Sequence, residues 1–234
     1  MSWVWSNLDL VLALTLRHAA LSVPPILLGF LLSVPLGYLC FRFGLGGPVF
    51  RVVSRTVLVV CALLYTIPSI PLFVTLPAVT GRSLLDPANV VIALTIYALA
   101  LMVSVACDAF VSVDEDTRRA ATAVGHDGWQ RFLRVDLPLA GPVLLSGVRV
   151  VSVSTISLLT VGQLIGVTTL GYLFTNGFQR RITEEILTGI VAVVVIAVVF
   201  DVLLVLIGRL LMPWTRARRD RRAPAPLAQE QVAT

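Results

Sequence analysis

The chain contains no lysine, only two histidines and three cysteines, and little charge of either sign. Charged residues occupy 13% of its 234 positions and hydrophobic residues 57%, whereas about a quarter of a soluble domain is charged. A chain of this length cannot hide so much apolar surface from water, which predicts an integral membrane protein. The absence of lysine excludes nucleotide hydrolysis by a phosphate-binding P-loop, because that loop requires its lysine.

The scarce cysteines and histidines predict no metal site. Cys40, Cys61 and Cys107 lie in apolar surroundings without ligand spacing, and we expect buried, inert thiols. His18 and His126 belong to no ligand cluster; the first is expected at a membrane interface and the second in a turn. The net charge of +5 comes from arginine alone. In a membrane protein, arginines more often mark loops kept in the cytoplasm than a surface that binds nucleic acid.

Five segments are apolar over the length of about 20 residues that a helix needs to cross a bilayer. They are residues 19–41, 56–81, 87–107, 139–170 and 186–212. Splitting the fourth near residues 162–171 would give a sixth span, and this alternative stays open. Prolines in the first two segments predict kinks or early helix ends there, at Pro24, Pro25, Pro35, Pro68, Pro71 and Pro77. The predicted fold class is an all-α integral membrane protein, with residues 1–213 as its transmembrane domain.

The arginines are distributed unevenly between the two sides of the predicted membrane. Five spans place the basic tail, the loop with Arg42, Arg51 and Arg55, and the stretch 118–134 on one side. Because arginine-rich loops stay in the cytoplasm, we expect the N-terminus outside and the C-terminus inside. Residues 214–234 lack an apolar period and are expected to form a disordered tail, either solvated or lying on anionic lipid.

The one long polar, helix-forming stretch between the apolar segments, residues 112–138, begins with the pattern of a short helix. Asp114 can cap its N-terminus, Glu115 and Asp116 favour the positive end of its dipole, and Gly125 suits the left-handed position after its end. We therefore predict a helix between Asp114 and Gly125.

A second helix is predicted directly after this turn. Asp127 can cap it, and Trp129, Phe132 and Leu133 recur at helical spacing as an apolar stripe. Pro138 is expected to end this helix where the chain re-enters the membrane. The unit then reads as a helix-turn-helix on the cytoplasmic surface.

Two interpretations of this unit remain open on pattern alone. One is a solvated amphipathic connector, as loops between spans often contain. The other is a docking surface, because Ala120, Ala121 and Ala123 give the first helix a face of small residues that another protein can approach closely.

The stretch resembles the cytoplasmic signature of inner-membrane permeases of binding-protein-dependent ABC importers, EAA-x3-G-x9-I-x-LP. The register is kept throughout, with Arg119, Ala120, Ala121, Gly125, Val135, Leu137 and Pro138 at the signature positions. Arg119 stands where the family has glutamate, so the resemblance implies an altered electrostatic contact with the partner. The segments GVTTLGYLF and DVLLVLIGRLLMP, with Gly147 and Arg149, resemble the glycine betaine, carnitine and choline (osmoprotectant) branch. Methionine-type permeases share the five-span core.

The resemblance implies a permease subunit, not an enzyme, in the bacterial cytoplasmic (inner) membrane. Residues 118–138 would contain a coupling helix seated in a separate ATPase subunit, which binds the ATP and Mg²⁺, and this chain would hold no cofactor. The other implied partners are membrane lipid, an extracytoplasmic substrate-binding protein and a second permease chain, in a homodimer or a heterodimer. Alternatives are a permease for another small solute such as an amino acid, an ion-coupled secondary transporter, which usually shows inverted repeats and more spans, and a non-transporting scaffold.

Arg149 and Asp201 are the charges furthest inside the apolar segments. Arg149 follows Pro138 by about 11 residues and Asp201 precedes Pro213 by about 12, so at ~1.5 Å per residue both lie roughly 17 Å from the cytoplasmic end. Charges at membrane depth face a partner or a water cavity. We prefer an ion pair between the fourth and fifth spans. Separate contacts with carbonyl groups or water, or contact of Asp201 with a cationic substrate, are the alternatives.

Overall fold

The computed structural model describes residues 2–83 and 85–214, and these residues form helices and loops without a strand. Five of these helices are long and apolar enough to cross a membrane, which confirms the predicted all-α class and the five spans. The predicted disordered tail lies, apart from Trp214, outside the described residues.

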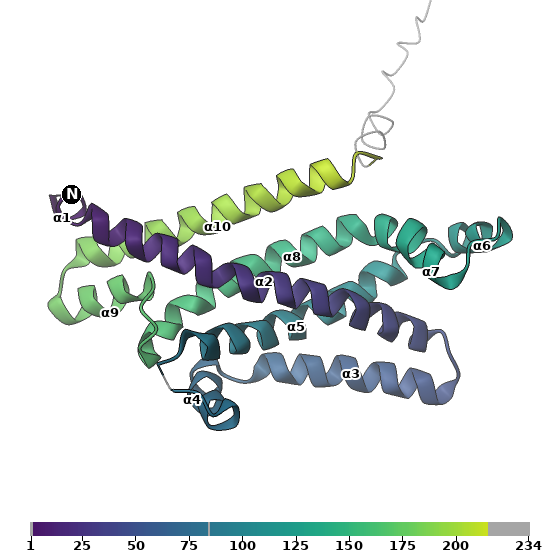
Figure 1. Cartoon of the computed structure of the whole chain (residues 1–234), viewed down its shortest axis with the longest axis horizontal. Helices are drawn as coiled ribbons and strands as arrows, with labels where there is room; N and C mark the ends of the chain where they lie inside the picture. Colours follow the sequence, from purple (N-terminus) through teal and green to yellow (C-terminus); the bar gives the residue numbers. More distant parts are fainter. Residues whose placement is uncertain (1, 84, 215–234) are drawn as a thin grey trace, which may run out of the picture.

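The elements form an elongated bundle whose long helices run roughly along one axis (Figure 1). The first half of the chain contains α1 (Ser2–Ser6), α2 (Leu8–Gly44), α3 (Pro48–Thr66), α4 (Ser69–Thr80) and α5 (Pro87–Val111). The second half contains α6 (Glu115–Ala123), α7 (Gly128–Arg131), the π-helical segment η1 (Phe132–Asp136), α8 (Leu137–Leu159), the 3-10 segment η2 (Thr160–Ile165), α9 (Gly171–Arg180) and α10 (Thr183–Leu211). The helices α6 and α7 project at one end of the bundle, and α1, α4 and α9 lie towards the other.

The centre of the bundle is α5, which packs against α2, α3, α4 and α8. Its contact with α2 is close because small residues face each other. A Cβ atom on Gly37 would lie 2.5 Å from the Cβ of Ala106, and one on Gly29 would lie 2.4 Å from that of Ala98. Without a hydrophobic driving force between helices in lipid, such small-residue contacts let the backbones approach and gain packing energy.

The predicted second span differs from the observed helices. The segment 56–81 is divided between α3 and α4, because Ile67 is extended with φ −63° and ψ 127°. A residue before proline is driven out of the helical region by the ring of Pro68. The carbonyl group of Ile67 accepts a hydrogen bond of 2.6 Å from the Tyr97 hydroxyl of α5, so the break is satisfied by its neighbour. By contrast, the prolines of the first segment, Pro24, Pro25 and Pro35, lie inside α2 without ending it.

The fourth segment ends with a turn and not with another span. After η2, Gly166 adopts φ +86°, and the chain enters α9, which has 10 residues. A helix of that length rises only about 15 Å and cannot cross a bilayer. The six-span alternative is therefore wrong for the part of the chain that the structure describes.

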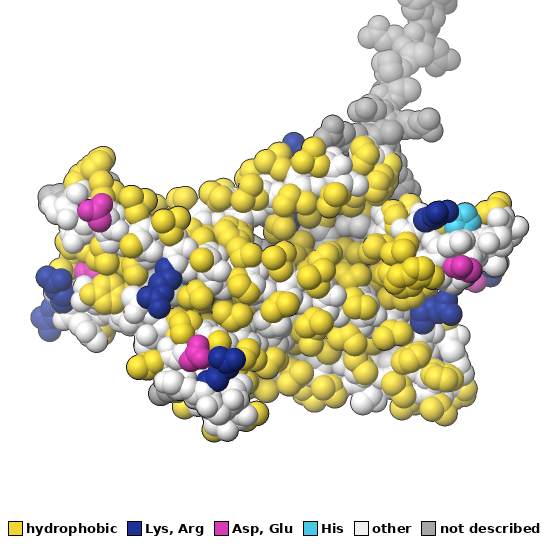
Figure 2. All heavy atoms as spheres, viewed as in Figure 1, with side chains coloured by type: hydrophobic (Ala, Val, Ile, Leu, Met, Phe, Trp, Pro, Cys, Tyr) yellow, Lys and Arg dark blue, Asp and Glu magenta, His cyan; other side chains and the backbone are white. Residues whose placement is uncertain are grey.

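The outside of the bundle is mostly apolar along its middle. Figure 2 shows hydrophobic side chains over the long central part of one face, with most charged side chains towards the two ends. The helices α3 and α10 are the least covered by the rest of the chain, because only 11% and 6% of their apolar windows are buried. These faces are free for lipid or for another membrane subunit.

Candidate functional site

The predicted first helix of the polar stretch is present as α6, and both of its ends are capped. The carboxylate of Asp114 accepts hydrogen bonds from the backbone of Asp116 (2.7 Å) and Thr117 (3.4 Å). At the other end Gly125 has φ +91°, its N–H donates to Thr122, and the next N–H, of His126, donates to the carbonyl of Ala121. This pair of bonds is the Schellman arrangement, which needs a left-handed residue. The predicted capping by Asp114 and the predicted conformation of Gly125 are confirmed.

The second helix begins as predicted but does not end where it was predicted to end. Asp127 and Gln130 form a capping box at the start of α7. The helix then continues through η1 into α8, with Pro138 in the first turn of α8. Proline in a helix removes a donor and clashes with the carbonyl four residues earlier, and the wider π turn directly before it gives the ring room. The expectation that Pro138 ends the helix is wrong.

The apolar stripe of this second helix is only partly buried. The ring of Phe132 packs on Tyr38 of α2, with centroids 4.4 Å apart, and it is 9% exposed. Trp129 and Leu133 remain 68% and 44% exposed. Of these three residues, Phe132 contacts the bundle, and Trp129 and Leu133 are exposed beside α6.

The signature residues of α6 point in two directions. Arg119 and Ala120 are exposed, as is Ala123, whereas Ala121 is buried at 8% exposure. The single face of three alanines expected from the sequence is therefore not formed. Successive residues of a helix are about 100° apart, so Ala120 and Ala123 share the outer face and Ala121 turns inwards. Signature positions 135, 137 and 138 are partly buried where α8 begins.

Arg119 forms ion pairs within its own helix. Its guanidinium lies 2.7 Å from the carboxylate of Glu115 and 3.6 Å from that of Asp116. All three side chains are at least 68% exposed, so these contacts contribute little to folding. Their effect is to give the outer face of α6 charges of both signs.

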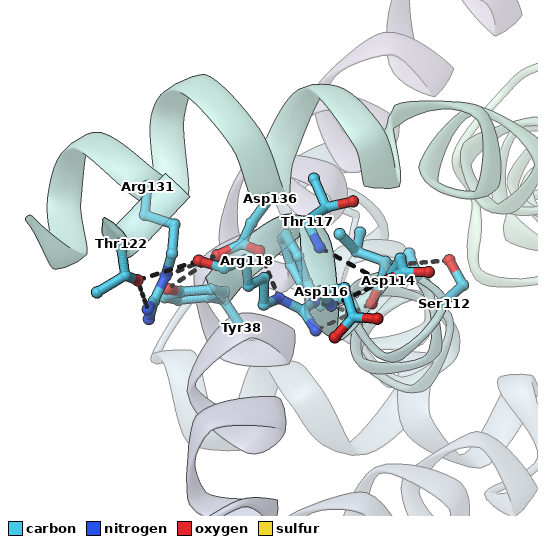
Figure 3. Close-up of polar contacts among 12 residues, drawn as sticks. Tyr38, Ser112, Asp114, Asp116, Thr117, Arg118, Thr122, Arg131 and Asp136 are labelled. Atoms are coloured by element: carbon cyan, nitrogen blue, oxygen red, sulfur yellow. Dashed lines mark hydrogen bonds and ion pairs between the residues drawn. The ribbon is translucent and has the colours of Figure 1, made fainter. Parts of the chain in front are cut away.

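A second charge cluster joins α6 to the residues beneath it (Figure 3). Arg118 and Asp136 form an ion pair with Nε 2.6 Å from Oδ1, and their side chains are 12% and 1% exposed. Tyr38 and Arg131 also approach the same carboxylate. This pair was not predicted from the sequence. The position of Asp136 could have indicated the pair, because Asp136 follows Phe132 by four residues and so shares the buried face of the same helix.

A cavity of about 1150 Å³ opens between α6 and the adjoining ends of α2 and α5. Its walls contain Arg42 of α2, Val111 of α5, and Glu115, Arg119 and Thr122 of α6. Arg118 and Arg131 of the charge cluster also line this cavity, so the cluster holds α6 to the bundle along the cavity wall.

The two predicted intramembrane charges meet. Arg149 of α8 donates to both carboxylate oxygens of Asp201 of α10, over 2.6 and 2.8 Å. Such a two-bond contact is among the strongest that arginine makes. The side chains stay 42% and 31% exposed on the outside of the bundle. The preferred pairing is confirmed, and its role in transport stays a prediction.

The histidine and cysteine predictions have different outcomes. Cys40, Cys61 and Cys107 are free and buried, as expected. The expected interfacial position of His18 is wrong. Its side chain is fully buried, and its Nε2 lies 3.0 Å from the carbonyl oxygen of Ile156. His126 follows α6 in the turn before α7, as predicted. Within the described residues there is no group of three or more side chains suited to holding a metal ion.

The chain is similar to known membrane transport proteins over most of its length. Residues 33–217 match the family described as "Binding-protein-dependent transport system inner membrane component". The chain is 30% identical over 206 residues to the osmoprotectant import permease protein OsmW of Salmonella typhimurium, covering 86% of this chain and 92% of that protein. It is 28% identical over 198 residues to the glycine betaine/carnitine/choline transport system permease protein OpuCD of Bacillus subtilis, covering 84% and 82%.

Among solved structures, the chain is similar to one from the MetNI methionine ABC transporter in an inward-facing conformation. The TM-score is 0.75 at 21% identity, and the match covers 88% of this chain and 98% of that one. At this identity the similarity shows the fold alone, and it confirms the predicted methionine-importer-permease type of fold.

Proposed function

Because the chain belongs to the family of binding-protein-dependent transport system inner membrane components, we propose that it forms the membrane pathway of an ABC importer for a small osmoprotectant. Glycine betaine, choline and carnitine are the candidate substrates, since curated relatives over most of the chain are named for them. An amino-acid substrate is the alternative within the same architecture. The chain itself carries out no hydrolysis in this proposal, and the ATP and Mg²⁺ belong to a partner subunit.

The observation that carries the proposal is the geometry of α6. It is capped at both ends, projects from one end of the bundle, and presents small and charged side chains outwards at Ala120, Ala123 and Arg119. Capping satisfies the terminal backbone groups and so opposes fraying of the helix ends, and alanines allow close approach. We propose that α6 is the coupling helix that docks on the ATPase, and that this end of the bundle is cytoplasmic.

The departure at Arg119 defines the expected partner surface. The outer face of α6 has Glu115 and Asp116 at its start and Arg119 one turn later, already paired with them. A basic patch on the ATPase facing the two acids, or an acidic side chain facing Arg119, would match this pattern. The apolar Val124 and Trp129 beside it, 76% and 68% exposed, favour an apolar rim.

The test is purification of the tagged full chain from its native membrane, with mass spectrometry of the proteins that remain bound. We expect an ATP-binding subunit, and we expect the complex in liposomes to import glycine betaine, choline or carnitine when ATP is supplied. An Ala120→Arg change should reduce bound ATPase at unchanged membrane abundance. Ser83→Arg, which adds the same exposed charge at the opposite end of the bundle, is the matched control.

Three results would contradict the proposal in different ways. Import of methionine without import of any quaternary ammonium compound would assign the alternative substrate. Substrate movement by the purified chain alone, driven by a proton or sodium gradient, would identify a secondary transporter. Absence of both an ATPase and transport would leave only the scaffold interpretation.

A further inference from the structure

We propose that Arg118 and Asp136 are positioning residues that join the coupling helix rigidly to the membrane helices, so that movement of α6 is passed directly to α2, α5 and α8. The proposal rests on the function proposed above and adds two residues outside the family signature as quoted. It follows from a buried network in which each charged group contacts more than one element (Figure 3).

Arg118 uses every face of its guanidinium. Its Nε donates to Asp136 over 2.6 Å, its Nη1 donates to the carbonyl of Val113 over 3.0 Å, and its Nη2 donates to the carbonyl of Phe110. Phe110 is in the last turn of α5 and Val113 follows its end, so both carbonyls lie at the negative end of the helix dipole, which attracts a cation. The guanidinium also lies over the ring of Phe41 of α2, 4.4 Å from its centroid. One side chain therefore fastens α6 to α2, α5 and η1 together.

The carboxylate of Asp136 is the acceptor on which Arg118, Tyr38 and Arg131 converge. Asp136 is the last residue of η1, its side chain is 1% exposed, and the chain continues from it directly into α8. The Tyr38 hydroxyl of α2 donates to Oδ2 over 3.4 Å, and Arg131 Nε lies 3.8 Å from the same oxygen. Arg131 in turn donates to Thr122 of α6 over 3.3 Å. Arg118 directly, and Thr122 through Arg131, thus connect α6 to the Asp136 carboxylate at the start of α8.

The arrangement suits force transmission more than stability. A buried ion pair adds little net stability compared with apolar groups of similar size, because both charges lose their hydration. Its geometry is demanding, since the planar guanidinium fits its acceptors in one orientation only. Arg118 is adjacent to Arg119, so the docking face and the fixed face are one residue apart on a helix of 9 residues. A displacement of α6 by the ATPase is passed to α8 through this ion pair.

The first experiment measures the joint without the partner. Spin labels are placed at exposed Leu45 and Ala123, which both line the cavity beside α6, after the three native cysteines are replaced by alanine. In the full chain in nanodiscs we expect one narrow distance. The double variant Arg118→Met with Asp136→Leu replaces both charges by apolar side chains of similar size. We expect its distribution of distances between the two labels to be broad. Arg118→Lys, which keeps the charge without the fork, should lie between them. An unchanged narrow distance in the double variant overturns the proposal.

The second experiment measures coupling in the complete importer. We expect the double variant to retain its ATPase subunit but to import about tenfold less glycine betaine per ATP hydrolysed, the equivalent of about 1.4 kcal/mol of coupling. The matched control is Arg82→Met with Asp86→Asn, which removes an exposed ion pair at the other end of the bundle and leaves an asparagine able to cap α5. Unchanged import per ATP, despite a broadened distance, would also overturn the proposal. If the unaltered complex contains no ATPase, the proposed function fails instead, and the spin-label result still decides whether the joint exists.

Discussion

Gly125 is the residue at which backbone geometry alone constrains the coupling loop. Its φ of +91° belongs to the left-handed region, and a Cβ atom there would meet nothing within 4 Å. A substitution is therefore strained by conformation and not by crowding. An ordinary L-residue in this region costs about 1–2 kcal/mol, and asparagine tolerates it better. A β-branched residue is the least compatible.

We predict that Gly125→Val leaves the protein inserted in the membrane but abolishes transport-stimulated ATP hydrolysis, because relief of the strain tilts α6. Gly125→Asn should retain much of the stimulation. The measurement is ATP hydrolysis with and without substrate-loaded binding protein, at matched permease abundance. Normal stimulation in the valine variant would return the stretch to the role of a simple connector.

Local chemistry explains which of these residues were predictable. Asp114, Gly125 and Asp127 act on backbone groups within a few positions of themselves, so sequence order alone indicates their roles. Arg118 and Asp136 are 18 positions apart, and tertiary packing, including that of Phe132 on Tyr38, brings them together.

At the scale of elements, α8 connects the coupling loop with the middle of the membrane. One apolar helical segment runs from Gly128 to Ile165, and charged contacts fix it at two points along its length. Asp136 holds its start to α2 and α6, and Arg149 holds its middle to α10. A rigid element fixed at both points moves as one body, which a coupling lever requires.

The Arg149–Asp201 pair should behave as a coupled unit. A lone charge at the bilayer centre costs about 2.5–3.5 kcal/mol on the translocon scale, and the partial exposure of both side chains lowers the expected penalty. We predict that Arg149→Leu and Asp201→Leu each lower thermal stability in nanodiscs. The double change should be milder than the sum of the two single changes, because no charge is left stranded.

An exposed pair gives the control for this cycle. The effects of Arg82→Leu and Asp86→Asn on thermal stability should be additive, since a surface ion pair contributes little. Strict additivity at Arg149 and Asp201 would show that their contact has no energetic weight. Recovery of stability without recovery of import in the double variant would give the pair a role in the pathway as well.

The two proline predictions show what sequence reasoning lacks at this scale. Pro68 breaks the second span, and Tyr97 supplies the hydrogen bond that makes the break tolerable. Pro138 is predicted to end a helix but lies in the first turn of α8, where the wider π turn before it gives the ring room. Spacing and composition reveal apolar length reliably. They do not reveal whether a neighbour or a local change of helix type offsets a proline.

At the scale of the molecule, the described helices are packed at the centre and little covered at the outside. Its centre is filled by α5 packed on α2 and α8, and α3 and α10 bury little of their surface within the chain. The two charged side chains of the Arg149–Asp201 pair also remain partly exposed on the outside. Five spans with uncovered helices and a membrane charge pair at their surface are consistent with half of a transport channel.

We therefore predict that the solubilised importer contains two permease chains for every two ATPase subunits. Native mass spectrometry gives the mass of the complex directly. Loss of one chain changes that mass by 25.3 kDa, far more than loss of a lipid or a detergent molecule does. Coexpression of this chain with two different affinity tags, followed by sequential purification, separates the two arrangements. Recovery of both tags in one complex shows a homodimer, and recovery of one tag with a second permease shows a heterodimer. An active complex with a single permease chain would contradict the prediction, because one chain would then have to enclose the pathway alone.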